Sequence, residues 1–87
     1  MGSYRIEWKR SATKELKKLP KDAVLRLLQA VEQLSADPYP TGVRKLAGSK
    51  HSYRKREGTY RIIYNVVART LVIEIVRIGH RKDVYDR

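Results

Sequence analysis

Residues 53–67 read Tyr53-Arg54-Lys55-Arg56-Glu57-Gly58-Thr59-Tyr60-Arg61-Ile62-Ile63-Tyr64-Asn65-Val66-Val67. Residues 53–56 and 60–67 are two strand-like segments on either side of Glu57-Gly58-Thr59, a turn centred on glycine. Glycine reaches the positive φ angles that tight hairpin turns require. The stretch therefore predicts a β-hairpin, and the rest of the fold is arranged around it.

Further segments extend this hairpin on both sides. Residues 68–70 form a second turn, and residues 71–78 are a nearly continuous apolar strand that Glu74 interrupts and Gly79 ends. Such a run suits a central strand. Residues 43–46 are a short strand candidate, which a loop at residues 47–52 separates from the hairpin.

The N-terminal half predicts one strand and two helices. Residues 4–9 alternate apolar with charged side chains, as a half-buried strand does. A short helix follows over residues 12–18, with Ser11 as its N-cap and Pro20 beyond its end. A longer helix over residues 21–35 carries one apolar stripe at helical spacing, formed by Val24, Leu27, Leu28, Val31 and Leu34. A proline- and glycine-containing segment at residues 37–42 stops it.

This order of elements defines the expected fold class. It is an α+β fold with an N-terminal strand, a helical hairpin and then a three- to four-stranded, largely antiparallel sheet, in two layers. The length of 87 residues allows one domain, residues 1–87. The chain has no cysteine, which excludes disulfides and thiolate metal sites. The sequence has neither a membrane-spanning run nor a signal-like segment, so we expect a cytoplasmic protein without membrane association.

The charge is strongly basic and unevenly distributed. Lys and Arg number 20 against 9 Asp and Glu, which gives a net charge of +11. Between residues 44 and 61 one acid, Glu57, accompanies the basic residues Arg44, Lys45, Lys50, Arg54, Lys55, Arg56 and Arg61. A second group at the end of the last strand comprises Arg77, His80, Arg81 and Lys82. Antiparallel neighbours place the start of one strand beside the end of the next, so both groups should share one edge of the sheet.

These two groups indicate a footprint for the phosphates of a nucleic acid. The alternative is a basic surface that serves solubility. Arginine predominates, and its planar guanidinium binds two phosphate oxygens at once and stays charged at neutral pH. Tyr53, Tyr60 and Tyr85 lie within or beside the groups, where their rings could stack on bases. For Tyr60 and for the nearby Tyr64 the alternative is packing within the strands.

The same residues carry a resemblance to a known family. The hairpin sequence, the apolar strand and then Ile78-Gly79-His80-Arg81-Lys82-Asp83-Val84-Tyr85 resemble the RelE/ParE superfamily of toxin–antitoxin toxins. Tyr4-Arg5-Ile6-Glu7-Trp8, Lys14-Glu15-Leu16-Lys17-Lys18-Leu19-Pro20 and residues 37–48 fit the same pattern, so the resemblance covers nearly the whole chain. The C-terminal residues are similar to the RelE branch, whose members cleave mRNA in the ribosomal decoding site, whereas ParE-type members poison DNA gyrase.

The resemblance implies roles for individual residues. Arg54 and Arg56 fall where the RelE branch has basic residues that contact the cleaved phosphate, and Arg61 falls on the arginine that steadies the transition state. Arg81 matches an arginine implicated in protonation or charge relief of the leaving group. Tyr85 matches a tyrosine that stacks on the substrate or helps to activate the 2′-hydroxyl. Further candidate RNA contacts nearby are Arg44, Lys45, Lys50, Tyr53, Lys55, Arg77 and Lys82.

The chemistry expected of these residues needs neither a metal nor another cofactor. The 2′-oxygen attacks the adjacent phosphorus, and fixed guanidinium groups stabilise the negative charge that develops on the phosphoryl oxygens. Arginine is a poor proton carrier at neutral pH. Arg54 stands where the branch usually has a lysine, and the neighbouring Lys55 should point to the opposite face of its strand. Histidine is the usual acid or base near neutral pH, so His80 either acts as acid or base or faces away from Arg81. We therefore expect slow intrinsic chemistry, with the ribosome supplying the substrate geometry.

The resemblance also implies the partners. These are the ribosome, mRNA and a RelB-like antitoxin with a flexible, acidic and apolar C-terminal segment. Operator DNA would be contacted only through the antitoxin. The helical hairpin with Trp8, Tyr39, Val43 and Leu46 is the apolar surface that such a segment would cover. Two alternatives stay open: a ParE-like inhibitor of DNA gyrase without nuclease activity, and a plain RNA- or ribosome-binding module.

Overall fold

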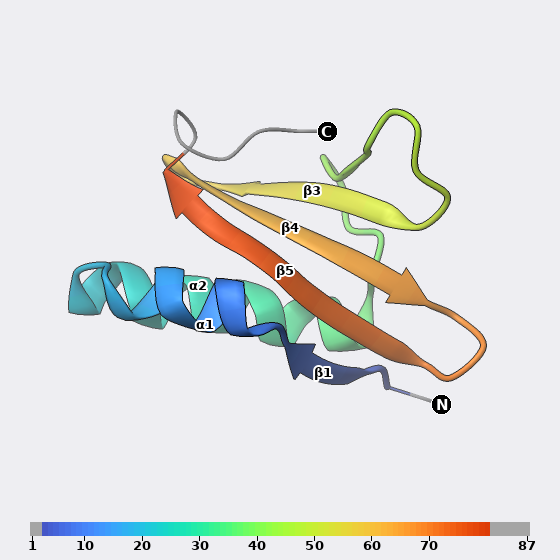
Figure 1. Cartoon of the computed structure of the whole chain (residues 1–87), viewed down its shortest axis with the longest axis horizontal. Coiled ribbons are helices and arrows are strands. Elements are labelled where there is room, and N and C mark those ends of the chain that lie inside the picture. Colours follow the sequence, from blue (N-terminus) through green and yellow to red (C-terminus); the bar gives the residue numbers. More distant parts are fainter. Residues whose placement is uncertain (1–2, 81–87) are drawn as a thin grey trace.

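The structure, a computed structural model, describes residues 3–80 of the chain (Figure 1). The elements are β1 (Arg5–Trp8), α1 (Arg10–Lys17), α2 (Lys21–Ala36), β2 (Arg44–Lys45), β3 (Ser52–Glu57), β4 (Tyr60–Val67) and β5 (Val72–His80). The strands form one sheet in the order β1-β5-β4-β3-β2, in which β1 runs parallel to β5 and the other pairs are antiparallel. The predicted α+β class is confirmed, and β1 joins the four later strands in a single sheet.

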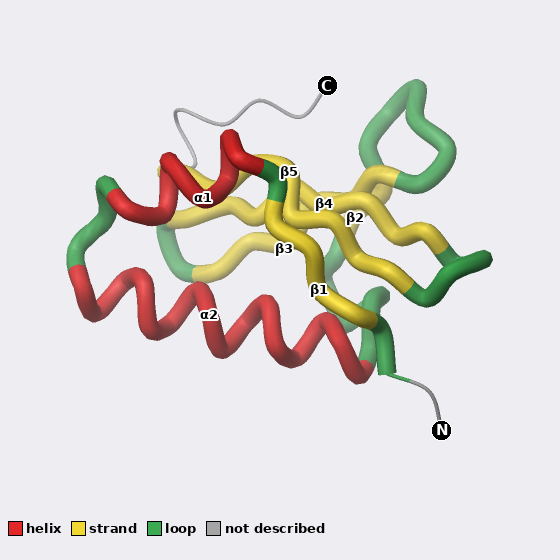
Figure 2. Tube along the Cα trace, turned by 60° about the horizontal axis from the view of Figure 1, so that its bottom comes forward, coloured by secondary structure: helices red, strands yellow, loops and turns green. Residues whose placement is uncertain are grey.

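Both helices pack on one face of this sheet (Figures 1 and 2). Alternate residues of β4, Ile62, Tyr64 and Val66, point toward the helices and belong to the main core, together with Leu27 and Leu34 of α2. Ile63 belongs to a separate small cluster with Leu46, against which Val76 packs. Because successive strand residues point to opposite faces, Ile63 marks the face that the helices leave uncovered.

The β3–β4 hairpin confirms the prediction made from its sequence. Glu57 pairs with Tyr60, so Gly58 and Thr59 form a two-residue loop. Gly58 has a φ of +61°, as the first loop residue of a type II′ turn requires. A Cβ atom at Gly58 would also lie 3.3 Å from a terminal nitrogen of Arg26 on α2. Backbone conformation and space thus both favour glycine at this position.

The last strand differs from the prediction at both ends. Leu71 has a φ of +55° and lies in the turn, so β5 begins at Val72. Gly79 does not end the strand, because Gly79 pairs with Arg61 and His80 pairs with Tyr60. The ladder therefore continues to the level of the Gly58 turn, which places the end of β5 beside the start of β4.

Two details of the helices were predicted wrongly. The N-cap of α1 is Lys9 rather than Ser11, whose hydroxyl donates a 2.7 Å hydrogen bond to the carbonyl of Val76 on β5. In α2 the residues that face the core are Ala23, Leu27, Ala30, Val31 and Leu34. The small side chains of Ala23 and Ala30 allow α2 to pack closely on the sheet. Leu28 lies to one side of this contact and is 40% exposed. Across residues 3–80, neither helix has the length and apolar content to cross a membrane.

Candidate nucleic-acid interface

Strand register brings the basic residues of three strands into two rows. Arg56 of β3 lies opposite Arg61 of β4, and Arg61 lies opposite Gly79 of β5. The neighbouring row runs through Arg44, Arg54, Ile63 and Arg77. The expectation that the basic groups converge is confirmed for Arg54, Arg56, Arg61 and Arg77, which lie at adjacent register positions.

The two rows share one face of the sheet. Directly opposed residues of neighbouring strands point to the same side, and Ile63 marks the side away from the helices. Arg44, Arg54, Arg56 and Arg61 therefore project from the uncovered face, and we refer to these four residues as the arginine face. The sheet, rather than a loop, thus fixes the relative backbone positions of the four arginines.

The arginine face brings residues of like charge close together. Arg44 and Arg54, and likewise Arg56 and Arg61, are directly opposed pairs of like charge. Such pairs repel one another, and a phosphate bound between two guanidinium groups relieves the repulsion through charge-assisted hydrogen bonds. Gly79, opposite Arg61 on β5, contributes no side chain to this row. Arg61 is itself half-buried, and its Nε is shielded from solvent.

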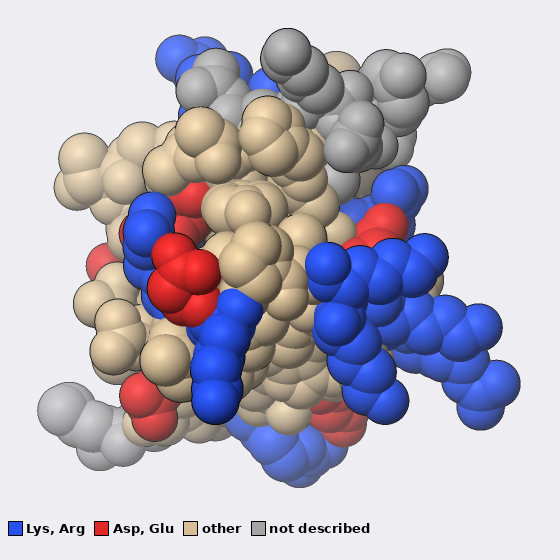
Figure 3. Space-filling model, turned by 90° about the vertical axis from the view of Figure 1, so that its left-hand side faces the viewer, with Lys and Arg blue, Asp and Glu red and all other residues tan. Residues whose placement is uncertain are grey.

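The charge of the wider surface is also predominantly positive. Figure 3 shows the end of the molecule where the α1–α2 turn and the β3–β4 hairpin lie, with Lys and Arg in separate groups and fewer acids beside them. One basic stripe lies outside the two basic groups identified in the sequence and consists of the exposed Arg10, Lys14 and Lys17 of α1 and of Lys18, its C-cap. Its spacing of i, i+4, i+7 and i+8 was the available signal, since such residues share one side of a helix.

Several candidate residues lie away from the arginine face. Lys55 points to the helix side, as alternation predicted, and its Nζ lies 3.3 Å from a carboxylate oxygen of Glu57. Tyr53 also points to the helix side, where its ring stacks on Tyr64 at a centroid distance of 5.9 Å. Burial raises the pKa of Tyr64, whose hydroxyl donates to the carbonyl of Pro38. The position of Tyr53 therefore indicates packing rather than base stacking.

The remaining candidate residues lie at the end of β5, on β2 and on the loop that follows β2. The ring of His80 lies edge-on to Tyr60 at 5.8 Å, on the opposite side of the sheet from Arg61 by alternation. It lines a hollow with Glu15, Lys18, Leu19, Tyr60, Ile78 and Gly79. Lys45 and Lys50 are exposed on β2 and on the loop that follows it. Arg81, Lys82 and Tyr85 lie outside the described residues.

Arg77 is engaged by α1. Its guanidinium donates to a carboxylate oxygen of Glu15 from Nε at 2.9 Å, and its Nη2 lies 2.8 Å from the same oxygen. Hydrogen bonding to that carboxylate raises the pKa of Arg77. The charge of Arg77 is thus offset within the protein. Among residues 3–80 no group of three or more His, Asp or Glu side chains is placed to hold a metal ion.

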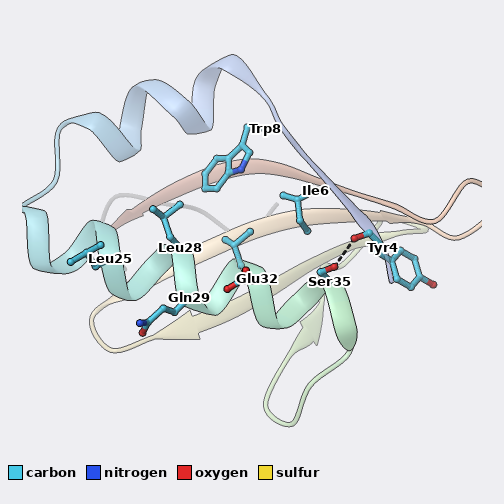
Figure 4. A pocket seen from close by; sticks show the side chains of 9 residues that line it. Tyr4, Ile6, Trp8, Leu25, Leu28, Gln29, Glu32 and Ser35 are labelled. Carbon is cyan, nitrogen blue, oxygen red and sulfur yellow. Dashed lines mark hydrogen bonds between the residues drawn. The ribbon is translucent and has the colours of Figure 1, made fainter. Parts of the chain in front are cut away.

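A second surface feature is an apolar groove between β1 and α2 (Figure 4). We call it the leucine groove, and its lining consists of Tyr4, Ile6, Trp8, Leu25, Leu28, Gln29, Val31, Glu32 and Ser35. Leu25 and Leu28 are 58% and 40% exposed. The backbone N–H of Tyr4 donates to the Ser35 carbonyl at 2.8 Å and the Ser35 hydroxyl donates to the Tyr4 carbonyl at 2.6 Å, which ties β1 to α2 at one end of the groove.

The apolar surface expected from the sequence is therefore only partly available. Trp8 lines the leucine groove, and Tyr39 is 49% exposed. Leu46 is buried with Ile63, and Val43 packs against the main core. Leu28, which the helical spacing placed in the core, lies at the surface and lines the groove together with Leu25.

Comparisons with known proteins identify relatives of this chain. Residues 6–85 match the family described as the ParE toxin of type II toxin–antitoxin systems, parDE. Toxin RelG of Mycobacterium tuberculosis is 32% identical over 97% of this chain and 98% of its own length. The putative toxin RelE1 of Methanocaldococcus jannaschii is 29% identical over 94% of both chains. The archaeal RelE–RelB complex of Pyrococcus horikoshii contains a chain with a TM-score of 0.82 and 33% identity, over 94% of this chain and 99% of that one.

These matches cover almost the whole chain and identify its class. The protein belongs to the ParE toxin family of type II toxin–antitoxin systems, within the RelE/ParE superfamily.

Proposed function

We propose that this protein is a ribosome-dependent endoribonuclease that cleaves mRNA and thereby inhibits translation. The observation that carries the proposal is the arginine face, on which Arg56 and Arg61 lie opposite each other in the register row that continues to Gly79. The toxin names RelG and RelE1 of two relatives support the RelE branch. Inhibitors of DNA gyrase share this fold, but the inhibition of gyrase requires no opposed arginines on the uncovered face of the sheet.

The proposed reaction is a transesterification. The 2′-oxygen of one nucleotide attacks the adjacent phosphorus, the bond from phosphorus to the 5′-oxygen breaks, and the products are a 2′,3′-cyclic phosphate and a 5′-hydroxyl. A base takes the proton of the 2′-hydroxyl, and the departing 5′-oxygen gains a proton. Arg54, Arg56 and Arg61 stabilise the charge on the phosphoryl oxygens. The family resemblance implies that Arg81 protonates the leaving group or relieves its charge, and that Tyr85 stacks on the substrate or helps to activate the 2′-hydroxyl.

The alternative activity is inhibition of DNA gyrase, which the family description includes. We expect the purified protein to stop protein synthesis and shorten mRNA in a translation extract, while gyrase supercoils plasmid DNA at an unchanged rate. The reason is that the arginine face suits a single scissile phosphodiester rather than a protein surface. Gyrase inhibition together with intact mRNA would establish the alternative.

We also propose that the partner is a RelB-like antitoxin whose apolar segment binds in the leucine groove. Relatives of this chain were solved in RelE–RelB complexes. The groove is apolar and has a volume of about 510 Å³, enough for several side chains of an amphipathic segment. The net charge of +11 favours an acidic partner.

A charged residue in the leucine groove should weaken the antitoxin complex. For Leu28→Glu we expect a loss of affinity of about 10- to 100-fold, because a carboxylate would be buried against apolar partner side chains. Leu71→Glu is the matched control, since Leu71 is 44% exposed but lies at the β4–β5 turn. Binding is measured by calorimetry. Equal affinities of the two variants would show that the antitoxin binds elsewhere.

A further inference from the structure

Strand β5 loses its neighbour on one side before it ends. The parallel pairing with β1 covers Val72 to Ile75, and β1 stops at Trp8. Beyond that point the described neighbour of this edge of β5 is α1. The hydroxyl of Ser11 donates to the carbonyl of Val76 at 2.7 Å, and the backbone N–H of Ile78 donates to the carboxylate of Glu15 at 2.9 Å. Side chains of α1 thus take the hydrogen-bonding positions that a longer β1 would occupy.

Glu15 engages two successive residues of β5 at once. One carboxylate oxygen accepts the Ile78 N–H, and the other accepts the Arg77 Nε–H at 2.9 Å and lies 2.8 Å from Nη2. The side chains of Glu15 and Arg77 are 28% and 41% exposed, so water screens the pair only in part. The carboxylate therefore fixes both the backbone and the side-chain direction at this point of β5.

The two anchored residues directly precede the part of β5 that meets the arginine face. Gly79 lies opposite Arg61, and His80 lies opposite Tyr60. A β-bulge at the level of Ile63 and Tyr64 interrupts the regular ladder just before these pairs. Such an irregularity leaves the register of the following residues less constrained by the ladder itself. A tether from α1 supplies a second constraint there.

We propose that Glu15 is a positioning residue for the reaction, because it holds the end of β5 in register with Arg61. This inference rests on the proposed nuclease function. Glu15 acts through Arg77 and Ile78 and not by contact with RNA. Its loss would let the end of β5 shift against β4, and a displacement of about 1 Å in an active site lowers the rate by up to about 100-fold.

Glu74 provides the matched control for a merely structural ion pair. Glu74 lies on β5 itself, and its side chain is 23% exposed. Its carboxylate is 3.5 Å from Nζ of Lys9 and accepts a hydrogen bond from the side chain of Asn65. It lies near the opposite end of the strand, opposite Asn65 rather than Arg61. Removal of the Glu15 carboxylate costs an ion pair and two hydrogen bonds, and removal of the Glu74 carboxylate costs an ion pair and one hydrogen bond. Only Glu15 contacts the residues that directly precede Gly79.

The test compares steady-state cleavage of ribosome-bound mRNA by the wild type, Glu15→Ala, Glu15→Gln and Glu74→Ala. For Glu15→Ala we expect kcat to fall about 10- to 100-fold with KM unchanged. Glu15→Gln keeps an acceptor for Ile78 but loses the charge, so it should recover part of the rate. Glu74→Ala should stay within about twofold of the wild type despite a similar loss in Tm. Equal kcat values for Glu15→Ala and Glu74→Ala would overturn the proposal.

A second readout does not depend on the reaction. Amide hydrogen exchange at Ile78 and Gly79 should accelerate at least about tenfold in Glu15→Ala, and should keep its wild-type rate in Glu74→Ala. Unchanged exchange in Glu15→Ala would overturn the positioning role whatever reaction the protein catalyses. A wild type that leaves ribosome-bound mRNA intact, with exchange altered as expected, would instead contradict the proposed function and retain the tether.

Discussion

Replacement of Arg61 by alanine should lower the rate of mRNA cleavage by about 100- to 1,000-fold, the usual effect of removing one fixed donor to a developing negative charge. Arg61 lies opposite both Arg56 and Gly79, so it occupies the centre of that register row. Arg61→Lys should recover only part of the rate, because an ammonium group keeps the charge but cannot bind two phosphoryl oxygens in one plane. Single-turnover rates on ribosome-bound mRNA measure the effect.

Arg69→Ala is the matched control for this prediction. Arg69 is an exposed arginine in the β4–β5 turn, so its removal changes the net charge equally but leaves the arginine face intact. Its rate should stay within about threefold of the wild type, as expected when only long-range steering is altered. If Arg61→Ala retained as much activity as Arg69→Ala at the same folded fraction, Arg61 would have no part in the chemistry.

Free mRNA should be cleaved at least about 1,000-fold more slowly than mRNA bound in the ribosomal decoding site. The arginine face supplies charge stabilisation, but guanidinium groups stay protonated at neutral pH and carry protons poorly. The orientation of the 2′-oxygen must then come from the ribosome, and such positioning contributes effective molarities of about 10⁵ M or more. Initial rates with the same labelled mRNA, free and ribosome-bound, give the ratio.

Salt provides the control for this comparison. Free RNA should still bind the basic surface, with an affinity that falls steeply as the salt concentration rises. Slow cleavage of RNA that is demonstrably bound would separate poor positioning from poor binding. Equal cleavage of free and ribosome-bound mRNA would refute the dependence on the ribosome.

The parts of the fold that could be predicted from the sequence are those that depend on neighbours along the chain. Gly58 with its flanking strand segments was enough for the hairpin, because turn geometry is set by two or three residues. Alternation also placed Lys55 on the other side of β3 from Arg54 and Arg56. Convergence of the arginines followed from antiparallel order alone.

The parts that could not be predicted depend on contacts between distant segments. Ser11 appeared to be a helix cap because its competing partner, the carbonyl of Val76, is 65 residues away. The bonds of Glu15 to Arg77 and Ile78 span 62 and 63 residues. Leu28 fits the helical stripe by spacing, and only the packing of the two alanines of α2 on the sheet reveals that it lies at the margin.

The same limit applies to the candidate site. Tyr53 carries an aromatic ring beside a run of cations, which suits base stacking, but in the folded chain Tyr39 and Tyr64 lie against that ring. Arg77 belongs to the basic group by sequence, yet a carboxylate from α1 engages it. Sequence position thus identifies charge, whereas the availability of that charge depends on which element packs beside it.

The central claim is that the arginine face cleaves mRNA on the ribosome, and the most direct measurement is the mapping of mRNA 5′ ends in cells that express the protein. We predict new ends within the codon in the decoding site, each with a 5′-hydroxyl, and their loss in the Arg61→Ala variant as well as in the Arg81→Ala and Tyr85→Phe variants. An unchanged set of mRNA ends together with gyrase-dependent DNA breaks would contradict it.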